Sequence, residues 1–294
     1  MTAKDNTSTK RPLIILTGPT AVGKTALSIG LAKAIQGEII SADSMQVYRG
    51  MDIGTAKITK EQMDGVPHHL IDIMDPSDSF HVMAFQQKCK EAMEDIYARH
   101  KIPILVGGTG FYIQSVLYDI SFTETDTDIE YRQELQKIAE EQGGYVLHAR
   151  LAKIDPEAAD EIHPNNVKRV IRALEFNHQT GEKISIHNEQ ERQKKSPYQF
   201  RYYVLSLPRE ILYDRINRRV DVMRRDGLVD EVKGLLQQGI TPNMVSMQGL
   251  GYKEIIDALQ GSCSFEEAFE RIKRETRHFA KRQFTWFRRE RDVT

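Results

Sequence analysis

A short apolar run followed by a glycine-rich loop constrains the fold more than any other feature of the sequence. Residues 13–16 are apolar, and residues 26–35 after the loop have helix-forming composition. The loop between them fits the pattern G-x-x-x-x-G-K-[ST] at every position. Its residues are Gly18, Pro19, Thr20, Ala21, Val22, Gly23, Lys24 and Thr25. The sequence therefore predicts a strand, a phosphate-binding loop and a helix.

The chemistry of such a loop follows from its backbone. Gly18 and Gly23 let the chain curl so that N–H groups point at phosphate oxygens, and the helix amino terminus adds a favourable dipole. We expect Lys24 to place its charge on a terminal phosphate and the Thr25 hydroxyl to bind Mg²⁺. The pattern indicates a diphosphate or triphosphate ligand and does not specify a nucleotide.

Further strand and helix signals alternate along the chain. Residues 38–41, 103–106 and 201–207 are predicted strands, and residues 85–100 and 110–117 are predicted helices. This alternation predicts an α/β fold, a P-loop NTPase-like parallel sheet flanked by helices. We expect a catalytic core over residues 12–120 and 198–294, a charged helical insertion over residues 121–197, and a disordered tail over residues 1–11.

Two polar residues follow the predicted strands at the edge where ligands bind. Asp43 comes after the second strand and could accept a proton from a nucleophile, or it could be a turn or helix-capping aspartate. Thr109, in a glycine turn after the third strand, could bond a phosphate or leaving-group oxygen, or cap a helix. No apolar strand ends in a clear Walker B aspartate, Asp72 being the nearest candidate, which disfavours an NTP-driven motor.

Composition excludes several classes of protein. Cys89 and Cys263 form no C-x-x-C pair, which argues against a zinc site and favours a reducing cytoplasm. No apolar run approaches the ~20 residues needed to span a bilayer, so no membrane partner is expected. His68 and His69 are adjacent, so their side chains point different ways, and we predict structural hydrogen bonds for them instead of a shared metal.

A net charge of −1 hides an uneven distribution of basic residues. Ser264 and Glu267 form a predicted capping box that starts the last helix, and Lys and Arg crowd residues 271–291 of it. Such a basic stripe favours phosphate binding. The interleaved aromatic residues are expected mainly to pack into the core: Phe279, Phe284, Trp286 and Phe287.

Several stretches together resemble one family, the tRNA dimethylallyltransferases, also called tRNA isopentenyltransferases or IPP transferases. They occur in the family's order at residues 18–25, 41–57, 67–72, 107–112, 163–169, 172–175, 248–254 and 276–287. The chain ends at Thr294 with too few cysteines for the zinc finger of larger eukaryotic relatives, so it is similar to the bacterial type.

This resemblance implies an enzyme that moves the dimethylallyl group of dimethylallyl diphosphate onto N6 of adenosine 37, beside the anticodon on its 3′ side, in tRNAs that read codons beginning with U. The phosphate loop would hold the donor diphosphate in place of ATP. By the same resemblance, Asp43 takes the N6 proton, Thr109 bonds the bridging oxygen, and Lys24 with Mg²⁺ at Thr25 neutralises the diphosphate. Arg219 resembles the family arginine at the diphosphate.

Two neighbouring arginines, Arg215 and Arg218, remain alternatives to Arg219 for that role. The expected partner is the tRNA anticodon stem-loop, with the target base flipped out of its stack. The expected tRNA contacts are Asp43, Ser44, Met45, Gln46, Thr109, Lys168, Arg169, Arg172, Arg277, Lys281 and Arg282. We expect a cytoplasmic monomer.

Two other functions share parts of this pattern. A P-loop small-molecule kinase would have the same strand, loop and helix, and could use Asp43 to bind an acceptor hydroxyl. A non-catalytic RNA-binding module would keep the fold and the basic helix without forming product. Fold alone does not choose among the three.

Overall fold

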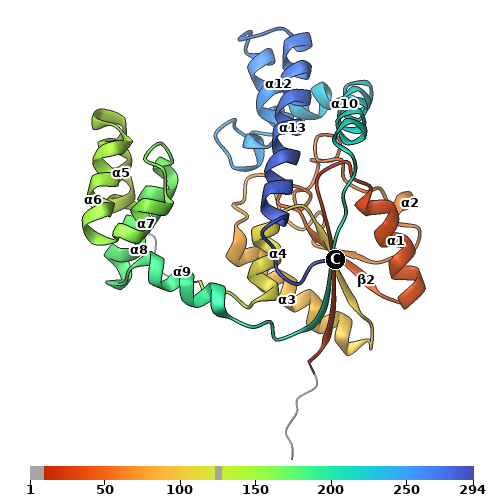
Figure 1. Ribbon diagram of the computed structural model, residues 1–294. Helices are drawn as coiled ribbons and strands as arrows, with labels where there is room; N and C mark the ends of the chain where they lie inside the picture. Colours follow the sequence, from red (N-terminus) through yellow and green to blue (C-terminus); the bar gives the residue numbers. More distant parts are fainter. Residues whose placement is uncertain (1–9, 123–127) are drawn as a thin grey trace, which may run out of the picture. The chain divides into compact units, whose positions relative to one another are not determined.

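Figure 1 shows the computed structural model of the chain, which describes residues 10–122 and 128–294. Residues 1–9 of the predicted tail lie outside this described part. For Arg11 the prediction is wrong, because its guanidinium pairs with Glu94 at 2.5 Å and lies 4.5 Å from the centre of the Tyr97 ring. Arg11 is therefore packed against α3 ahead of the first strand.

Five parallel strands form the central sheet, in the order β3-β2-β4-β1-β5. They are β1 (Pro12–Thr17), β2 (Glu38–Ala42), β3 (His68–His69), β4 (Pro103–Gly107) and β5 (Gln199–Val204). The predicted parallel α/β fold is confirmed. The strand β5 starts and ends earlier than expected, and β3 was not predicted because two residues are too short for a periodic pattern.

Helices cover both faces of the sheet (Figure 1). The helix α1 (Lys24–Ile35) packs on one face, and α3 (Val82–Ala98) and α4 (Gly110–Leu117) pack on the other. The helix predicted over residues 85–100 is α3, and it buries Phe85, Cys89, Met93 and Ile96. The remaining elements of this part are α2 (Lys60–Met63), α10 (Arg209–Arg225), α11 (Leu228–Gln237), η1 (Ser246–Gln248), α12 (Tyr252–Leu259) and α13 (Phe265–Phe287).

The register of the sheet places three strand ends at one level. Thr17 of β1 and Ala42 of β2 are both paired with Gly107, the last residue of β4. The buried Thr17 hydroxyl also donates a hydrogen bond of 2.7 Å to the Gly107 carbonyl. The loops that leave these strands therefore begin side by side at the carboxyl edge of the sheet.

The chain divides into two compact units, one formed by Met1–Leu117 with Pro197–Thr294 and the other by Tyr118–Ser196. The expected insertion, residues 121–197, differs from the second unit by three residues at its start and one at its end. The described elements of this unit are all helices: α5 (Ile129–Gln142), α6 (Gly144–Ile154), α7 (Pro156–Glu161), α8 (Val167–Thr180) and α9 (Ile184–Gln193).

The second unit has a small core of its own. Leu135, Leu147, Leu151 and Leu174 are buried in it, and the buried Glu175 carboxylate pairs with Arg132 at 2.5 Å. The helix α8 ends before Gly181, which has a left-handed φ of 73°. Across the described ranges, no helix combines the length and apolarity that crossing a membrane requires.

Candidate active site

The phosphate loop leaves β1 through a turn that only glycine can make. Gly18 has φ 139°, and a Cβ atom there would lie 2.5 Å from the Leu205 carbonyl oxygen. Ala21 also has a positive φ, of 64°, so left-handed and right-handed backbone conformations alternate along the loop before Gly23 caps α1. Alternating conformations of this kind turn successive N–H groups inward and form an anion-binding concavity.

Lys24 lies across the loop. Its ammonium donates hydrogen bonds to the Gly18 carbonyl at 2.9 Å and the Pro19 carbonyl at 2.8 Å. Burial lowers the pKa of Lys24 to about 8; the charge of Asp43 opposes this shift and Arg219 reinforces it. A bound anion would supply the opposite charge that this buried ammonium lacks.

The three candidate arginines of α10, Arg215, Arg218 and Arg219, occupy different environments. The Arg219 Nη1 donates to the Thr20 hydroxyl at 3.3 Å, and burial lowers the pKa of its guanidinium while Asp43 opposes that shift. The Arg215 Nη1 donates to the Val22 carbonyl at 3.4 Å. Arg218 is instead 78% exposed and pairs with Asp214 at 2.9 Å. The structure thus brings Arg215 and Arg219 to the phosphate loop and leaves Arg218 in solvent.

Asp43 combines a turn role with an available oxygen. Its Oδ1 accepts hydrogen bonds from the backbone N–H groups of Met45 at 2.8 Å and Gln46 at 3.2 Å. Its Oδ2 forms no hydrogen bond with a described residue. Asp43 is close enough to Lys24 and Arg219 to interact electrostatically with both. The carboxylate is therefore oriented by its own turn, with one oxygen left for a ligand.

Thr109 sits at the same edge. Its backbone N–H donates to the Ala42 carbonyl at 3.3 Å, which ties the glycine turn to the residue before Asp43. Its carbonyl accepts the first hydrogen bond of α4 from Ile113 at 3.2 Å. The Thr109 hydroxyl forms no hydrogen bond with a described residue. The structure thus brings together Lys24, Asp43, Thr109 and Arg219.

The segment after Asp43 is fixed by hydrogen bonds to its own backbone. The Gln46 amide donates to the carbonyls of Thr55 at 3.2 Å and Ala56 at 3.4 Å, while Ser41 donates to its oxygen at 3.4 Å. Ser44, Met45 and Gln46 are all partly buried. These bonds fix the Gln46 side-chain amide, while its backbone N–H donates to the carboxylate of Asp43.

Sequence reasoning missed the residue that anchors this segment. The Glu231 carboxylate accepts hydrogen bonds from the Tyr252 hydroxyl at 2.7 Å and from three backbone N–H groups. Those groups belong to Asp52 at 2.9 Å, Ile53 at 2.7 Å and Gly54 at 3.1 Å. Tyr252 is fully buried. The motif at residues 248–254 was the available signal, because it contains the tyrosine that holds Glu231.

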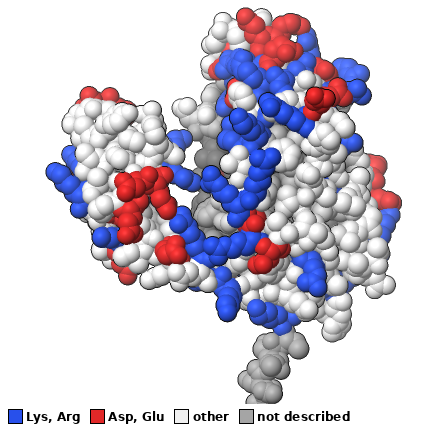
Figure 2. Space-filling view, viewed as in Figure 1, with Lys and Arg blue, Asp and Glu red and all other residues white. Residues whose placement is uncertain are grey.

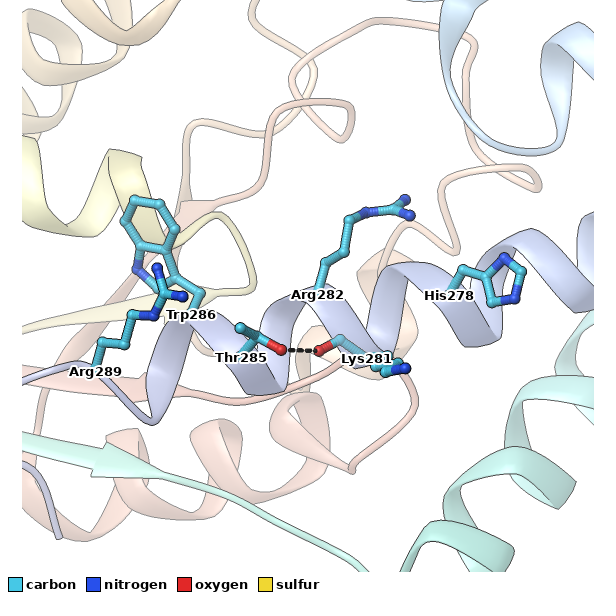
Figure 3. A pocket seen from close by; sticks show the side chains of 6 residues that line it. All are labelled: His278, Lys281, Arg282, Thr285, Trp286 and Arg289. Carbon is cyan, nitrogen blue, oxygen red and sulfur yellow. Dashed lines mark hydrogen bonds between the residues drawn. The ribbon is translucent and has the colours of Figure 1, made fainter. Parts of the chain in front are cut away.

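Exposed basic residues lie along α13, and Figure 2 shows Lys and Arg gathered over this helix. An open hollow of about 450 Å³ lies against it (Figure 3), lined by His278, Lys281, Arg282, Thr285, Trp286 and Arg289. Lys281, Arg282 and Arg289 are exposed and form no salt bridge with a described residue. Arg277 is partly buried and donates to the Asn217 side-chain oxygen at 2.6 Å.

The aromatic residues of α13 divide between core and surface. Phe287 is buried, and Phe284 packs on a core cluster that includes Ala21 and Val22 of the phosphate loop, as predicted. Trp286 instead lines the hollow, edge to face with the exposed Phe111 at 6.4 Å between ring centroids. The predicted capping box of Ser264 and Glu267 is confirmed.

The basic residues predicted on the second unit are exposed. Lys168, Arg169 and Arg172 lie on α8, and none of them forms a salt bridge with a described residue. Their apolar neighbours Val170, Ile171 and Leu174 are buried. The helix therefore directs its cations outward while its other face holds the core of the unit.

The oxygen donors near the loop suit a magnesium ion only in part. The exposed Thr25 hydroxyl forms no hydrogen bond with a described residue, and within the described ranges no three His, Cys, Asp or Glu residues are grouped to hold a metal. Mg²⁺ prefers oxygen ligands and keeps several waters or phosphate oxygens. Thr25 fits such an ion only if the ligand's phosphates supply most of the coordination.

The remaining polar residues that the sequence singled out have structural partners. His68 Nδ1 lies 2.8 Å from the Val66 carbonyl oxygen and His69 Nε2 lies 2.7 Å from the Glu38 carboxylate, so the predicted structural hydrogen bonds are confirmed. Asp72 follows β3 and pairs with Lys57 at 2.5 Å. It lies three positions after the last residue of β3, so it does not end a strand.

The chain is similar to known proteins along nearly its whole length. The family described as IPP transferase matches residues 46–290, and the family described as isopentenyl transferase matches residues 12–79. The chain belongs to the IPP transferase family. Two tRNA dimethylallyltransferases, from Lachnoclostridium phytofermentans and Bacillus pumilus, are 60% and 53% identical to it. The alignments cover 96% and 97% of this chain and 90% and 89% of those proteins.

Solved structures of the family have the same fold. The tRNA isopentenylpyrophosphate transferase from Bacillus halodurans is 50% identical, with a TM-score of 0.73, and the match covers 97% of this chain and 89% of that one. A eukaryotic dimethylallyltransferase acting on tRNA is 34% identical, with a TM-score of 0.80, over 94% of this chain and 70% of that one. In this IPP transferase, Lys24, Asp43 and Thr109 meet at the carboxyl edge of the sheet.

Proposed function

We propose that this chain transfers the dimethylallyl group from dimethylallyl diphosphate to N6 of the adenosine on the 3′ side of the anticodon in tRNAs that read codons beginning with U. The observation that carries this proposal is the meeting of a phosphate loop, a carboxylate and a free hydroxyl at one sheet edge in an IPP transferase. Relatives at 60% and 53% identity are named tRNA dimethylallyltransferases.

The donor diphosphate binds the inward N–H groups of Gly18–Thr25. Lys24 and Arg219 bring positive charge to it, and Arg215 supports the loop from the same helix as Arg219. The Thr25 hydroxyl would hold a Mg²⁺ ion, which would supply further positive charge beside the diphosphate. These groups act mainly by stabilising the negative charge that develops on the departing diphosphate.

The reaction forms a bond from N6 to the allylic carbon and breaks that carbon's bond to the bridging oxygen. The electron pair of the broken bond leaves with the diphosphate, and Thr109 donates a hydrogen bond to the bridging oxygen. The N6 proton passes to Asp43 Oδ2, because Oδ1 is already held by Met45 and Gln46. Because the exocyclic amine N6 is a weak nucleophile, the reaction depends on its positioning and on removal of its proton.

The target adenosine leaves its stack to reach the buried edge, where Asp43, Ser44, Met45, Gln46 and Thr109 contact it and its neighbours. Exposed cations bind the phosphates of the anticodon stem-loop. On α13 these are Lys281 and Arg282, with Arg277 beside them; on α8 they are Lys168, Arg169 and Arg172. The protein acts as a cytoplasmic monomer.

A transfer assay tests this function. The protein is incubated with Mg²⁺, carbon-labelled dimethylallyl diphosphate and a tRNA that reads a U-initial codon, with Lys24→Ala as the control. We expect label in the tRNA and one diphosphate released for each group transferred. If no label enters the tRNA while ATP is consumed with a small-molecule acceptor, the protein is a kinase. If the tRNA binds equally to both proteins and stays unlabelled, it is an RNA-binding module.

A further inference from the structure

A buried amide on α13 has no role in the chemistry described so far. Gln283 is only 6% exposed, and it follows the buried Ala280 by three residues and precedes the buried Phe287 by four. Those positions form the inward stripe of the helix. An amide in an otherwise apolar stripe costs free energy unless both of its ends are hydrogen-bonded.

Both ends of this amide are used, and they reach different loops of the active site. The Gln283 Oε1 accepts from the backbone N–H of Thr20 at 2.8 Å, and its Nε2 donates to the Gly108 carbonyl at 3.0 Å. A backbone N–H can only donate and a carbonyl can only accept, so the two partners fix the amide's orientation. Gln283 therefore bridges the phosphate loop and the glycine turn.

The atoms it holds are next to groups of the proposed mechanism. Thr20 also accepts a hydrogen bond from Arg219 through its hydroxyl, at 3.3 Å. Gly108 immediately precedes Thr109, and a Cβ atom on Gly108 would lie 2.2 Å from the Gln283 Nε2. Glycine at this position thus permits the amide to approach the turn.

We propose that Gln283 is a positioning residue that sets the separation between the phosphate loop and Thr109. This inference rests on the proposed function, in which the loop holds the diphosphate and Thr109 bonds the oxygen that leaves with it. The two loops must hold opposite ends of one leaving group, so the separation between them decides how well both contacts form in the transition state. Lys281 and Arg282 on the same helix are exposed, so a change at the buried amide leaves these cations in place for the RNA backbone.

The first test replaces the amide by an apolar chain of similar length. In Gln283→Met we expect kcat to fall roughly tenfold to a hundredfold, the size typical of small misplacements, and KM for the donor to rise. The tRNA dissociation constant should change less than about twofold. Gln86→Met is the matched control: it removes a partly buried amide that donates to the Ser115 carbonyl at 2.6 Å, in the α3–α4 contact. Equal effects in both variants, or unchanged kinetics in Gln283→Met, overturn the proposal.

A pH series on Gln283→Glu adds a readout that general loss of packing does not produce. The glutamate accepts from Thr20 at any pH, but it can donate to the Gly108 carbonyl only when protonated. Activity relative to the wild type should therefore rise as pH falls, whereas the same ratio for Gln283→Met stays flat. If activity relative to the wild type has the same pH dependence in the two variants, the hydrogen bond from residue 283 to the Gly108 carbonyl does not position the turn. This series also applies if the methionine variant fails to fold.

Two measurements without turnover separate this inference from the proposed function. Binding of inorganic diphosphate should weaken in Gln283→Met, and hydrogen exchange at the Thr20 amide should accelerate. Transfer of label by the wild-type protein tests the proposed function. The diphosphate-binding and hydrogen-exchange comparisons test the role of Gln283, whether or not the wild-type protein transfers label. If diphosphate binding and Thr20 exchange match those of the wild type, Gln283 does not position the loop.

Discussion

The cations around the phosphate loop and the cations on the outer faces of α13 and α8 differ in how the protein holds them. Lys24 and Arg219 are partly buried, and their nitrogens are already hydrogen-bonded to atoms of the loop. Lys281, Arg282 and Lys168 are exposed and make no salt bridge with a described residue. The first group is preorganised for one small anion, and the second is free to follow an extended polyanion.

The preorganised group has a cost in stability. Burial lowers the pKa of Lys24 from its ordinary value of 10.5 to about 8. The charged form is therefore disfavoured in the folded protein, which destabilises the fold by about 3 kcal/mol below pH 8. The cost fades between pH 8 and 10.5 and is absent above that range. Retaining such a group makes sense only if a ligand needs its charge.

The largest effect that separates the two groups of cations is expected at Lys24. In Lys24→Ala we expect kcat/KM for the donor to fall roughly a thousandfold, because one preorganised charge contributes that much to stabilising a leaving group. The tRNA dissociation constant should stay within about twofold of the wild-type value. Steady-state kinetics and filter binding on the same preparation measure both. A large loss of tRNA binding would show that the two groups of cations are not separate.

The arginines of α10 sharpen the comparison within one helix. Arg219→Ala should lower kcat/KM for the donor by about a hundredfold, since it removes a partly buried hydrogen-bond donor at the loop. Arg218→Ala is the matched control, and it should change kcat/KM by less than about twofold, because this arginine is exposed and paired with Asp214. Equal losses in the two variants would contradict the assignment of Arg219 to the diphosphate.

The pH dependence of donor capture follows from the lowered pKa of Lys24. The ammonium is charged below about pH 8 and loses its proton as the pH rises through that value. We therefore expect kcat/KM for the donor to fall above pH 8, approaching about tenfold per pH unit. In Lys24→Arg the side chain stays charged, so the slower reaction should show no such fall. The same decline in both proteins would assign it to another group.

The exposed cations should give the smallest effects. Lys281→Ala with Arg282→Ala should weaken tRNA binding severalfold and reduce the slope of log Kd against log salt by about one for each phosphate that the variant no longer neutralises. The control pair, Lys273→Ala with Arg274→Ala, removes cations that already pair with Asp221 and Glu275. It should alter the slope less. An identical slope in the two double variants would remove α13 as the RNA surface.

The sequence predicted the parts of the site that depend on consecutive residues. The phosphate loop is a local pattern, and Asp43 and Thr109 follow directly from the rule that parallel strands end at one edge. The choice among Arg215, Arg218 and Arg219 was open, because it depends on how α10 is rotated against the loop. That rotation comes from packing of Leu212 and Ile216 against Ala21 and Val22.

Long-range bridges were beyond the reach of sequence patterns. Gln283 is separated from Thr20 by 263 positions, and Glu231 from Asp52 by 179. A buried Gln in a basic helix resembles any surface Gln until the burial of its neighbours is known. Tyr252 belongs to the motif at residues 248–254, but its partner Glu231 lies on α11, outside every motif found in the sequence. Buried polar bridges depend on tertiary packing, and periodicity alone does not report it.

A crystal structure with a non-reactive thio analogue of dimethylallyl diphosphate and the anticodon stem-loop tests the central claim most directly. We expect the diphosphate in the loop between Lys24 and Arg219, and the target adenine with its N6 roughly 3–3.5 Å from the allylic carbon and within hydrogen-bonding reach of Asp43 Oδ2. The exposed cations of α13 should meet only the RNA backbone. An adenine turned away from Asp43, or a diphosphate bound by the α13 cations instead of the loop, would contradict the claim.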